Sequence, residues 1–276
     1  MHQRFRVELL MMIVWPVMMS GLSTSAQALE EQAKAARNEK PTVLVELFTS
    51  QSCSSCPPAD RLISRLSRAA RPGVTVTLSC HIDYWNHLGW KDPFSLKLCS
   101  ERQESYAPVL DAGGEVYTPQ LVIDGREECV GADGGCITAQ IAAARARLPA
   151  ADLSLFANPD AAGQTVQIQF HARMRRTLPG EPSLQGLVAV FENGLETAVK
   201  RGENAGQTLK NDFVVRRLEP VFSMRAVEGA SADGELIVDW QPAWKLANAG
   251  IAAFLQDPES MAVYGATAAS LKATDR

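Results

Sequence analysis

The chain lacks the features that mark several large classes of protein. With a formal net charge of −4, it has no basic cluster and no arginine-rich helix, which argues against a nucleic acid as partner. Its six cysteines are too few for the disulfide-dense scaffold of a small secreted domain. No second C-x-x-C and no H-x-x-x-H accompanies Cys53 and Cys56, so a zinc site there would lack half of its usual ligands.

The N-terminal segment predicts export. Arg4 and Arg6 precede an apolar run over residues 9–19, and Ala26-Gln27-Ala28 has the small-residue pattern of a signal-peptidase site. The apolar run is shorter than the roughly 20 residues that span a bilayer, although an uncleaved membrane anchor is the alternative. We predict a signal peptide over residues 1–28 and a periplasmic or secreted location. No later stretch approaches the length of a transmembrane helix, so we expect no stable membrane insertion after cleavage.

One stretch organises the rest of the chain. Residues 43–48 form an apolar run broken by a single acid, which predicts a buried strand, and residues 58–71 have helical spacing. Cys53 and Cys56 lie between them, and a C-x-x-C between a strand and a helix is typical of a thioredoxin-like redox site. The positive end of the helix favours the Cys53 thiolate, the form that attacks disulfides. We predict a redox-active dithiol; a static disulfide and half of a zinc site are the alternatives.

The predicted elements indicate two domains. Strand 43–48, helix 58–71 and strand 74–81 make a β–α–β unit with parallel strands. We predict a linker over residues 29–40 and an α/β thioredoxin-like domain over residues 41–149. The other elements expected in this domain are helices 93–110 and 137–148 and a hairpin of strands 121–124 and 127–130 that turns at Asp124-Gly125.

After residue 149 the pattern changes to short strands with turn signals between them. Residues 165–170 alternate strictly between apolar and polar side chains, and no convincing helix follows. We predict an all-β sandwich-like domain over residues 150–276. Asn193-Gly194 predicts a hairpin between strands 187–191 and 195–200. The other strands expected are 212–218, 235–240, 250–256 and 261–264.

Several stretches together resemble a bacterial family of secreted proteins of unknown function within the thioredoxin-like superfamily. The resemblance spans nearly all of the predicted mature chain and implies the thioredoxin-like fold. It implies no substrate, because the family has no settled reaction. The stretches are VELFTSQSCSSCPPAD (45–60), HIDYW (81–85), LGWKDPF (88–94), YTPQ (117–120) and RGENAG (201–206).

Two residue roles follow from the resemblance. Thr118-Pro119 resembles the proline that thioredoxin-like proteins hold in cis opposite the C-x-x-C, which implies that Thr118 offers its backbone to a substrate and that Pro119 hinders metal capture. Glu46 resembles the buried acid that thioredoxins carry on the strand before the motif, although it stands one residue farther from Cys53 than is usual. A buried acid has a raised pKa, so Glu46 is predicted to take the proton of Cys56. An acid on the polar edge of the strand is the alternative.

Other polar and aromatic side chains follow the second predicted strand. His81 and Asp83 lie at its end, the edge where open α/β sheets bind ligands, and would serve either proton transfer or a structural hydrogen bond. The next stretch is rich in aromatic residues, which would either line a substrate groove or form a packed cover over the sheet. Its candidate substrate-binding residues are Tyr84, Trp85, His87 and Trp90.

The four remaining cysteines allow three pairings. We favour a Cys129–Cys136 disulfide, which would close a glycine-rich loop, and a Cys80–Cys99 disulfide as the second pair. Chain-entropy arithmetic gives these loops about 2.5 and 3.3 kcal/mol of stabilisation. An electron relay through these cysteines is the alternative.

These observations predict an exported thiol–disulfide oxidoreductase. Cys53 would start the exchange from an exposed position, and the shielded Cys56 would resolve the mixed disulfide. The expected partners are a protein or small-thiol disulfide substrate and a further redox protein, without a cofactor or a metal ion. The alternative is a non-catalytic binding or scaffold protein in which the C-x-x-C is a structural disulfide, and a metallochaperone is a weaker third option.

Overall fold

The computed structural model describes residues 40–71, 73–110 and 113–271. The predicted signal peptide over residues 1–28, with residues 29–39 of the predicted linker, lies outside the described residues. In the part of the chain that is described, no helix is long and apolar enough to cross a bilayer.

The first strand lies inside a large sheet, between two partners. β1 (Val43–Thr49) is buried along its whole length and pairs in parallel with β2 (Thr75–His81). α2 (Cys56–Ala69) connects the two strands, which confirms the β–α–β unit predicted from the sequence. On its other side β1 pairs antiparallel with β3 (Gln120–Ile123), which forms a hairpin with β4 (Glu127–Val130).

In this region the predicted turn is confirmed, whereas the helices have other bounds than the sequence predicted. Asp124 has φ 48° and Gly125 has φ 64°, the left-handed conformations that a two-residue hairpin turn requires. α3 (Lys97–Tyr106) is shorter than the predicted helix 93–110, and α4 (Gly134–Ala144) begins and ends earlier than the predicted helix 137–148. α3 begins late because Asp92 binds the backbone N–H of the next residues, including Phe94, and holds them in a turn.

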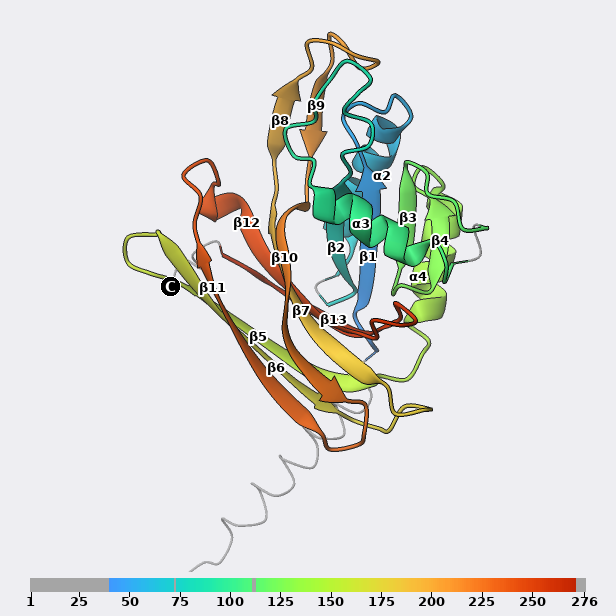
Figure 1. Cartoon of the computed structure of the whole chain (residues 1–276), viewed down its shortest axis with the longest axis vertical. Coiled ribbons are helices and arrows are strands. Elements are labelled where there is room, and N and C mark those ends of the chain that lie inside the picture. The colour runs from blue at the N-terminus through green and yellow to red at the C-terminus, as the bar shows by residue number, and fades with distance from the viewer. Residues whose placement is uncertain (1–39, 72, 111–112, 272–276) are drawn as a thin grey trace, which may run out of the picture. The chain divides into compact units, whose positions relative to one another are not determined.

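The large sheet continues into the second half of the chain. β10 (Val214–Arg225) runs parallel to β2 and pairs with it through Val214 and Ser79. The strand order is β13-β12-β7-β10-β2-β1-β3-β4 (Figure 1). The boundary predicted between residues 149 and 150 therefore separates segments that share one sheet and one compact unit from Lys40 onward. The separate folding of the two segments stays a prediction.

A second layer covers one face of the C-terminal strands. It is a three-stranded sheet in which β6 (Thr165–Met174) pairs with β5 (Ala151–Pro159) and β11 (Ser231–Asp239). Inward side chains of β6, such as Ile168, form one apolar cluster with side chains of the large sheet. The large-sheet strands on this side are β7 (Ser183–Glu192), the C-terminal half of β10, β12 (Ala249–Gln256) and β13 (Val263–Ser270).

The hairpin predicted at Asn193-Gly194 is wrong. β7 pairs with β10 and β12, whereas β8 (Leu195–Ala198) pairs with β9 (Thr208–Asn211) in a separate two-stranded sheet. Gly194 does turn the chain, with φ 65°. Its backbone N–H, however, binds the Asp212 carboxylate, and the N–H of Asn193 binds the carbonyl of Asn248, so the chain leaves the sheet instead of folding back on β7.

The two faces of β1 meet different helices, and this places the candidate site. Val45 and Leu47 point into an apolar cluster with residues of α2 and α4. Leu44 and Phe48 point the other way, into a cluster with α3. Because side chains alternate along a strand, Glu46 lies on the α3 face, and Thr49 lies on the α2 face.

Candidate functional site

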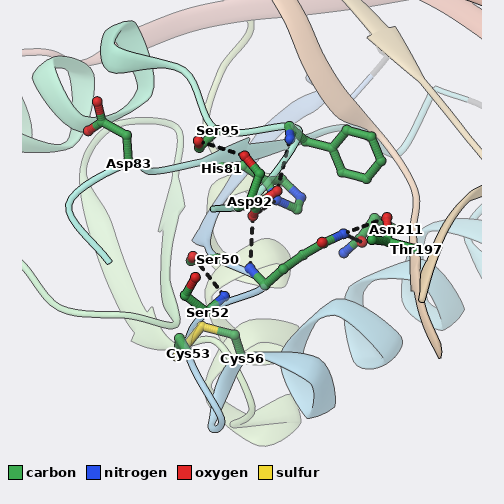
Figure 2. Close-up of polar contacts among 12 residues, drawn as sticks. Ser50, Ser52, Cys53, Cys56, His81, Asp83, Asp92, Ser95, Thr197 and Asn211 are labelled. Atoms are coloured by element: carbon green, nitrogen blue, oxygen red, sulfur yellow. Dashed lines mark hydrogen bonds and ion pairs between the residues drawn. A yellow bond between two sulfur atoms is a disulfide. The ribbon is translucent and has the colours of Figure 1, made fainter. Parts of the chain in front are cut away.

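Cys53 and Cys56 form a disulfide at the start of α2 (Figure 2). The turn after β1 brings Cys53 to the N-terminal end of α2, and Cys56 is the first helical residue. Prolines follow at once, in the first turn, where the N–H that they lack would have had no helical partner. Cys53 is 5% exposed and Cys56 is 0% exposed. Cys53 is therefore buried in the disulfide form, and the predicted exposed position is wrong, because the Thr118 and Ser55 side of the turn packs against its sulfur atom. Only the order of exposure follows the predicted division of roles, which itself stays a prediction.

The Thr118-Pro119 segment lies beside the disulfide. The peptide bond between the two residues is cis, which confirms the expectation from the resemblance. The carbonyl oxygen of Thr118 lies 3.9 Å from Cys53 Sγ and accepts a 3.5 Å hydrogen bond from the Ser55 hydroxyl. Trp85 Nε1 donates to Thr118 Oγ1 at 2.7 Å. Of the predicted substrate-binding residues, Thr118 therefore lies next to the Cys53 sulfur, and Trp85 is bonded to the Thr118 side chain.

The other aromatic candidates have different positions. The Tyr84 hydroxyl donates to Gln103 Oε1, and burial raises the pKa of Tyr84 to about 12. The carbonyl of Trp90 accepts a hydrogen bond from the Ser52 hydroxyl, so this residue supports the turn before Cys53. His87 is exposed, and its ring stacks on Trp85.

Glu46 is buried, as predicted, but the structure does not bring it to Cys56. Its carboxylate accepts two hydrogen bonds from Arg102, at 2.6 and 2.9 Å, and a third from the Tyr106 hydroxyl at 2.5 Å. These partners belong to α3, on the opposite face of β1 from α2. The predicted role of Glu46 as proton acceptor is therefore not supported, and its role is to bind α3 to the sheet.

A different buried carboxylate, Asp60, lies one helical turn after Cys56 on α2. It follows Cys56 by four residues on α2, and side chains at this spacing are neighbours on a helix. Burial raises the pKa of Asp60 to about 6, and the nearby charge of His81 opposes this rise. Asp60 Oδ1, Thr49 Oγ1 and His81 Nε2 are buried and have no partner at full hydrogen-bond geometry among the described residues, although the Thr49 hydroxyl is close enough to Asp60 to lower the pKa of that carboxyl. Such atoms are rare in folded proteins and often belong to functional sites.

His81 is held by Asp92 rather than by Asp83. His81 Nδ1 lies 2.7 Å from Asp92 Oδ2. Burial would lower the pKa of His81, but the Asp92 charge and hydrogen bond outweigh it, so the pKa is raised. The charge of His81 and two backbone N–H groups overcome burial and lower the pKa of Asp92. The two side chains thus form an ion pair, whereas Asp83 accepts a hydrogen bond from Ser100 and lies apart (Figure 2).

The ion pair also fixes the turn before the cysteines. Asp92 Oδ2 accepts a 2.8 Å hydrogen bond from the backbone N–H of Gln51. The Gln51 side chain donates to Thr197 Oγ1 and to Asn211 Oδ1, both at 3.0 Å. The turn is therefore held by β8 and β9, which belong to the second half of the chain.

The loop between β8 and β9, residues 199–207, contacts the cysteine turn directly. We call it the capping loop. Asn204 Nδ2 donates to the carbonyls of Gln51 and Cys53 at 2.9 and 3.0 Å. Glu203 Oε2 accepts a hydrogen bond from the backbone N–H of Ser54 at 2.9 Å.

The sequence pattern alone predicted no role for Asp60, Asp92, Glu203 or Asn204. A signal was present, because all four lie in the stretches that carry the family resemblance.

The disulfides Cys80–Cys99 and Cys129–Cys136 are both formed, which confirms the favoured pairing. The second of them closes a loop whose Gly131 N–H binds the carbonyl of Pro119 at 2.9 Å. Residues 40–71, 73–110 and 113–271 contain no group of three His, Cys, Asp or Glu side chains that could hold a metal ion.

Comparisons with known proteins show which family and which overall fold the chain shares. An X-ray structure of a protein from Agrobacterium tumefaciens is 28% identical, covers 87% of this chain and 98% of its own, and has a TM-score of 0.65. HBP35 of Porphyromonas gingivalis is 15% identical, covers 87% of this chain and 79% of its own, and has a TM-score of 0.62, so it shows similarity of fold alone. No curated protein matches the chain significantly. A family model described as "protein of unknown function (DUF1223)" matches residues 44–256, and the chain therefore belongs to that family.

Proposed function

We propose that the protein is an exported thiol–disulfide oxidoreductase that acts through Cys53 and Cys56. The observation that carries the proposal is the position of this pair, at the positive end of α2 and opposite Thr118-Pro119, with the titratable Asp60 one helical turn behind Cys56. A helix terminus favours the thiolate that begins exchange. Perturbed carboxylates beside such a pair are frequent at functional sites.

In the reduced protein, the Cys53 thiolate attacks one sulfur of a substrate disulfide. A Cys53–substrate mixed disulfide forms, and the other substrate sulfur leaves as a thiolate. Cys56 then loses its proton and attacks Cys53 Sγ, which releases the second substrate thiolate and forms the Cys53–Cys56 disulfide. Two electrons pass from the dithiol to the substrate, and the reverse sequence oxidises a substrate dithiol.

Asp60 is the proposed proton acceptor for Cys56. With a pKa of about 6, its carboxylate is mostly ionised at neutral pH and is a stronger base than an ordinary aspartate. Helical side chains lean towards the N-terminus, so Asp60 leans towards the turn that contains Cys56. The charge of His81 favours the ionised form of this carboxylate and lowers its pKa, and the weaker, opposing effect of the Asp92 charge raises it.

The fold and the location form part of the same proposal. The order β2-β1-β3-β4, with α2 and α4 against one face and α3 against the other, supports a thioredoxin-like first domain. The three-stranded sheet packed on the C-terminal strands supports a sandwich-like second domain. Three disulfides support a location in an oxidising compartment, where such bonds persist.

The reduction potential of the Cys53–Cys56 pair tests the proposal against its main alternative. Equilibration with glutathione buffers should give a value of about −270 to −180 mV, the range of exchange proteins. A value well below about −300 mV would show a structural disulfide. The protein would then be a binding or scaffold protein that does not exchange electrons.

Three variants test the assigned roles with a disulfide-bonded peptide as substrate. Cys53→Ser should form no mixed disulfide, and Cys56→Ser should accumulate one. Asp60→Asn should slow the resolving step by about tenfold or more, because general-base assistance is lost, while the first attack keeps its rate. Asp83→Asn is the matched control, because Asp83 bonds Ser100 away from the cysteines. Equal rates for Asp60→Asn and Asp83→Asn would exclude Asp60 as the proton acceptor.

A further inference from the structure

The capping loop binds both sides of a single peptide unit at the first cysteine. The carbonyl of Cys53 and the N–H of Ser54 belong to the same peptide bond. Asn204 donates to that carbonyl at 3.0 Å, and Glu203 accepts from that N–H at 2.9 Å. Asn204 is 1% exposed, whereas Glu203 is exposed to solvent. Consecutive residues from the second half of the chain thus set both the position and the electrostatics of this peptide unit.

The bond from Glu203 changes what Cys53 experiences. A backbone N–H just before a helix is a donor that would otherwise help to stabilise a nearby thiolate. Here a carboxylate occupies that donor, and the hydrogen bond from Ser54 lowers the pKa of Glu203, so the carboxylate is ionised at neutral pH. A fixed negative charge near a thiolate disfavours the thiolate. The disulfide has no charge and is unaffected.

We propose that Glu203 is a positioning residue that makes the Cys53–Cys56 pair more reducing, by occupying the Ser54 N–H and placing negative charge beside Cys53. This inference rests on the proposed function, because it concerns the regulation of the same dithiol. The direction of the change in reduction potential follows from the charges of the two redox states. Glu203 destabilises the reduced, thiolate-bearing state relative to the disulfide, so the pair gives up its electrons more readily.

A substitution of Glu203 leaves the other ionisable groups near the cysteine turn unchanged. Asp92 accepts a hydrogen bond from the N–H of Gln51, and Asp60 and His81 interact electrostatically with each other in the buried cluster. None of them contacts Glu203. A change of Glu203 alone therefore reports the effect of the capping loop and not of the buried cluster.

The experiment compares the full chain with Glu203→Gln and with Glu196→Gln. Glu196 is a suitable control because it is an exposed glutamate on the same hairpin, paired with Lys210. Each protein is equilibrated with glutathione, in the reaction of one Cys53–Cys56 disulfide with two glutathione thiols to give the dithiol and one glutathione disulfide. The pH dependence of Cys53 alkylation by iodoacetamide is measured in the reduced proteins.

Glu203→Gln should increase the equilibrium constant for reduction by about two- to fivefold, as expected for one exposed charge at a helix terminus. The alkylation profile of Cys53 should shift to lower pH. Both effects should shrink in about 1 M salt, where charges are screened within about 3 Å, whereas a purely structural effect of the substitution would persist. Glu196→Gln should match the wild type.

Three results would overturn the inference: an unchanged equilibrium constant in Glu203→Gln, an equal shift in Glu196→Gln, or a shift in Glu203→Gln that persists in about 1 M salt. A different result would disprove the proposed function. If the wild-type potential lies in the range of structural disulfides, exchange is excluded. The difference between Glu203→Gln and the wild type then still measures the influence of Glu203 on the bond.

Discussion

The two faces of β1 each carry a buried ionic cluster, and the clusters differ in how completely their atoms are paired. On the α3 face, Glu46 and Arg102 form a two-bond ion pair, and Tyr106 and Gln256 complete the network. On the α2 face, His81 and Asp92 are paired with each other. Asp60 and Thr49 beside them keep unpaired atoms, and so does the second ring nitrogen of His81.

This difference separates a structural cluster from a chemical one. The Glu46 carboxylate is fully bonded to Arg102 and Tyr106, so its contacts are those of a structural group that joins α3 to the sheet. A buried carboxylate without a full set of partners, such as Asp60, is held between its charged and neutral forms, as its pKa of about 6 shows. Burial of an acid on the strand before a C-x-x-C is therefore a poor guide to its role. The face on which it lies decides the role.

The largest expected effect is on the α3 face. Arg102→Met leaves the Glu46 carboxylate buried without its cation, and breaking a buried ion pair costs about 3–5 kcal/mol of unfolding free energy. Chemical denaturation measures this loss. The reduction potential of Cys53–Cys56 should not change, because Arg102 and the cysteines lie on opposite faces of the sheet.

The double variant Glu46→Leu/Arg102→Met sharpens this test. Replacing a buried pair by apolar side chains is often close to neutral, so it should recover most of the stability lost in Arg102→Met. A loss below about 1 kcal/mol in the single variant, or an altered potential, would contradict a structural role.

A pH-dependent effect is expected on the α2 face. The pKa of Asp60 is about 6 in the folded protein, above its ordinary value of 3.8. The folded state therefore binds this proton more tightly than the unfolded chain. This contribution to stability is complete below about pH 4 and is lost as the pH rises through about 6.

Asp60→Asn removes the loss of stability that deprotonation of Asp60 causes as the pH rises. Relative to the wild type, its unfolding free energy should rise by about 3 kcal/mol between pH 4 and pH 7, from a shift of about two units at about 1.4 kcal/mol each. Denaturation curves at several pH values measure the difference. A difference that is constant with pH would show that Asp60 titrates as an ordinary aspartate.

The smallest effect is expected at Thr49. Its hydroxyl has no hydrogen-bond partner among the described residues, so Thr49→Val should change the unfolding free energy by less than about 1 kcal/mol. Thr77→Val is the control on the same face, because Thr77 bonds the Ser67 hydroxyl at 2.7 Å. Its loss should be about 1 kcal/mol, since Ser67 is left unpaired. A larger loss in Thr49→Val than in Thr77→Val would show that Thr49 is bonded in solution.

Local patterns in the sequence predicted most of the first half of the fold. The apolar run before Cys53, the helical spacing after it and the Asp124-Gly125 turn all depend on residues that are close in sequence. The hairpin at Asn193-Gly194 failed because its turn signal is also local, whereas Asp212 and Asn248, which redirect the chain there, are distant. The joining of β10 to β2 has no local signal at all.

The candidate site was also predicted only where its residues are close in sequence or belong to a specific motif. Cys53, Cys56, Thr118 and Pro119 were identified because their spacing and the resemblance are specific. The role of Glu46 was misassigned because its position on β1 was compared by residue count rather than by face. The capping loop could not be assigned to the site from spacing alone, since roughly 150 residues separate it from the cysteines.

That separation has a consequence for how the protein matures. The contacts that bracket the Cys53–Ser54 peptide unit join residues 149 and 151 positions apart. Contacts of such long range form late, after many local ones, because of the entropy of closing a large loop. During synthesis Cys53 and Cys56 emerge long before the capping loop exists. A nascent chain that already pairs its cysteines therefore does so with a dithiol that lacks its native constraints.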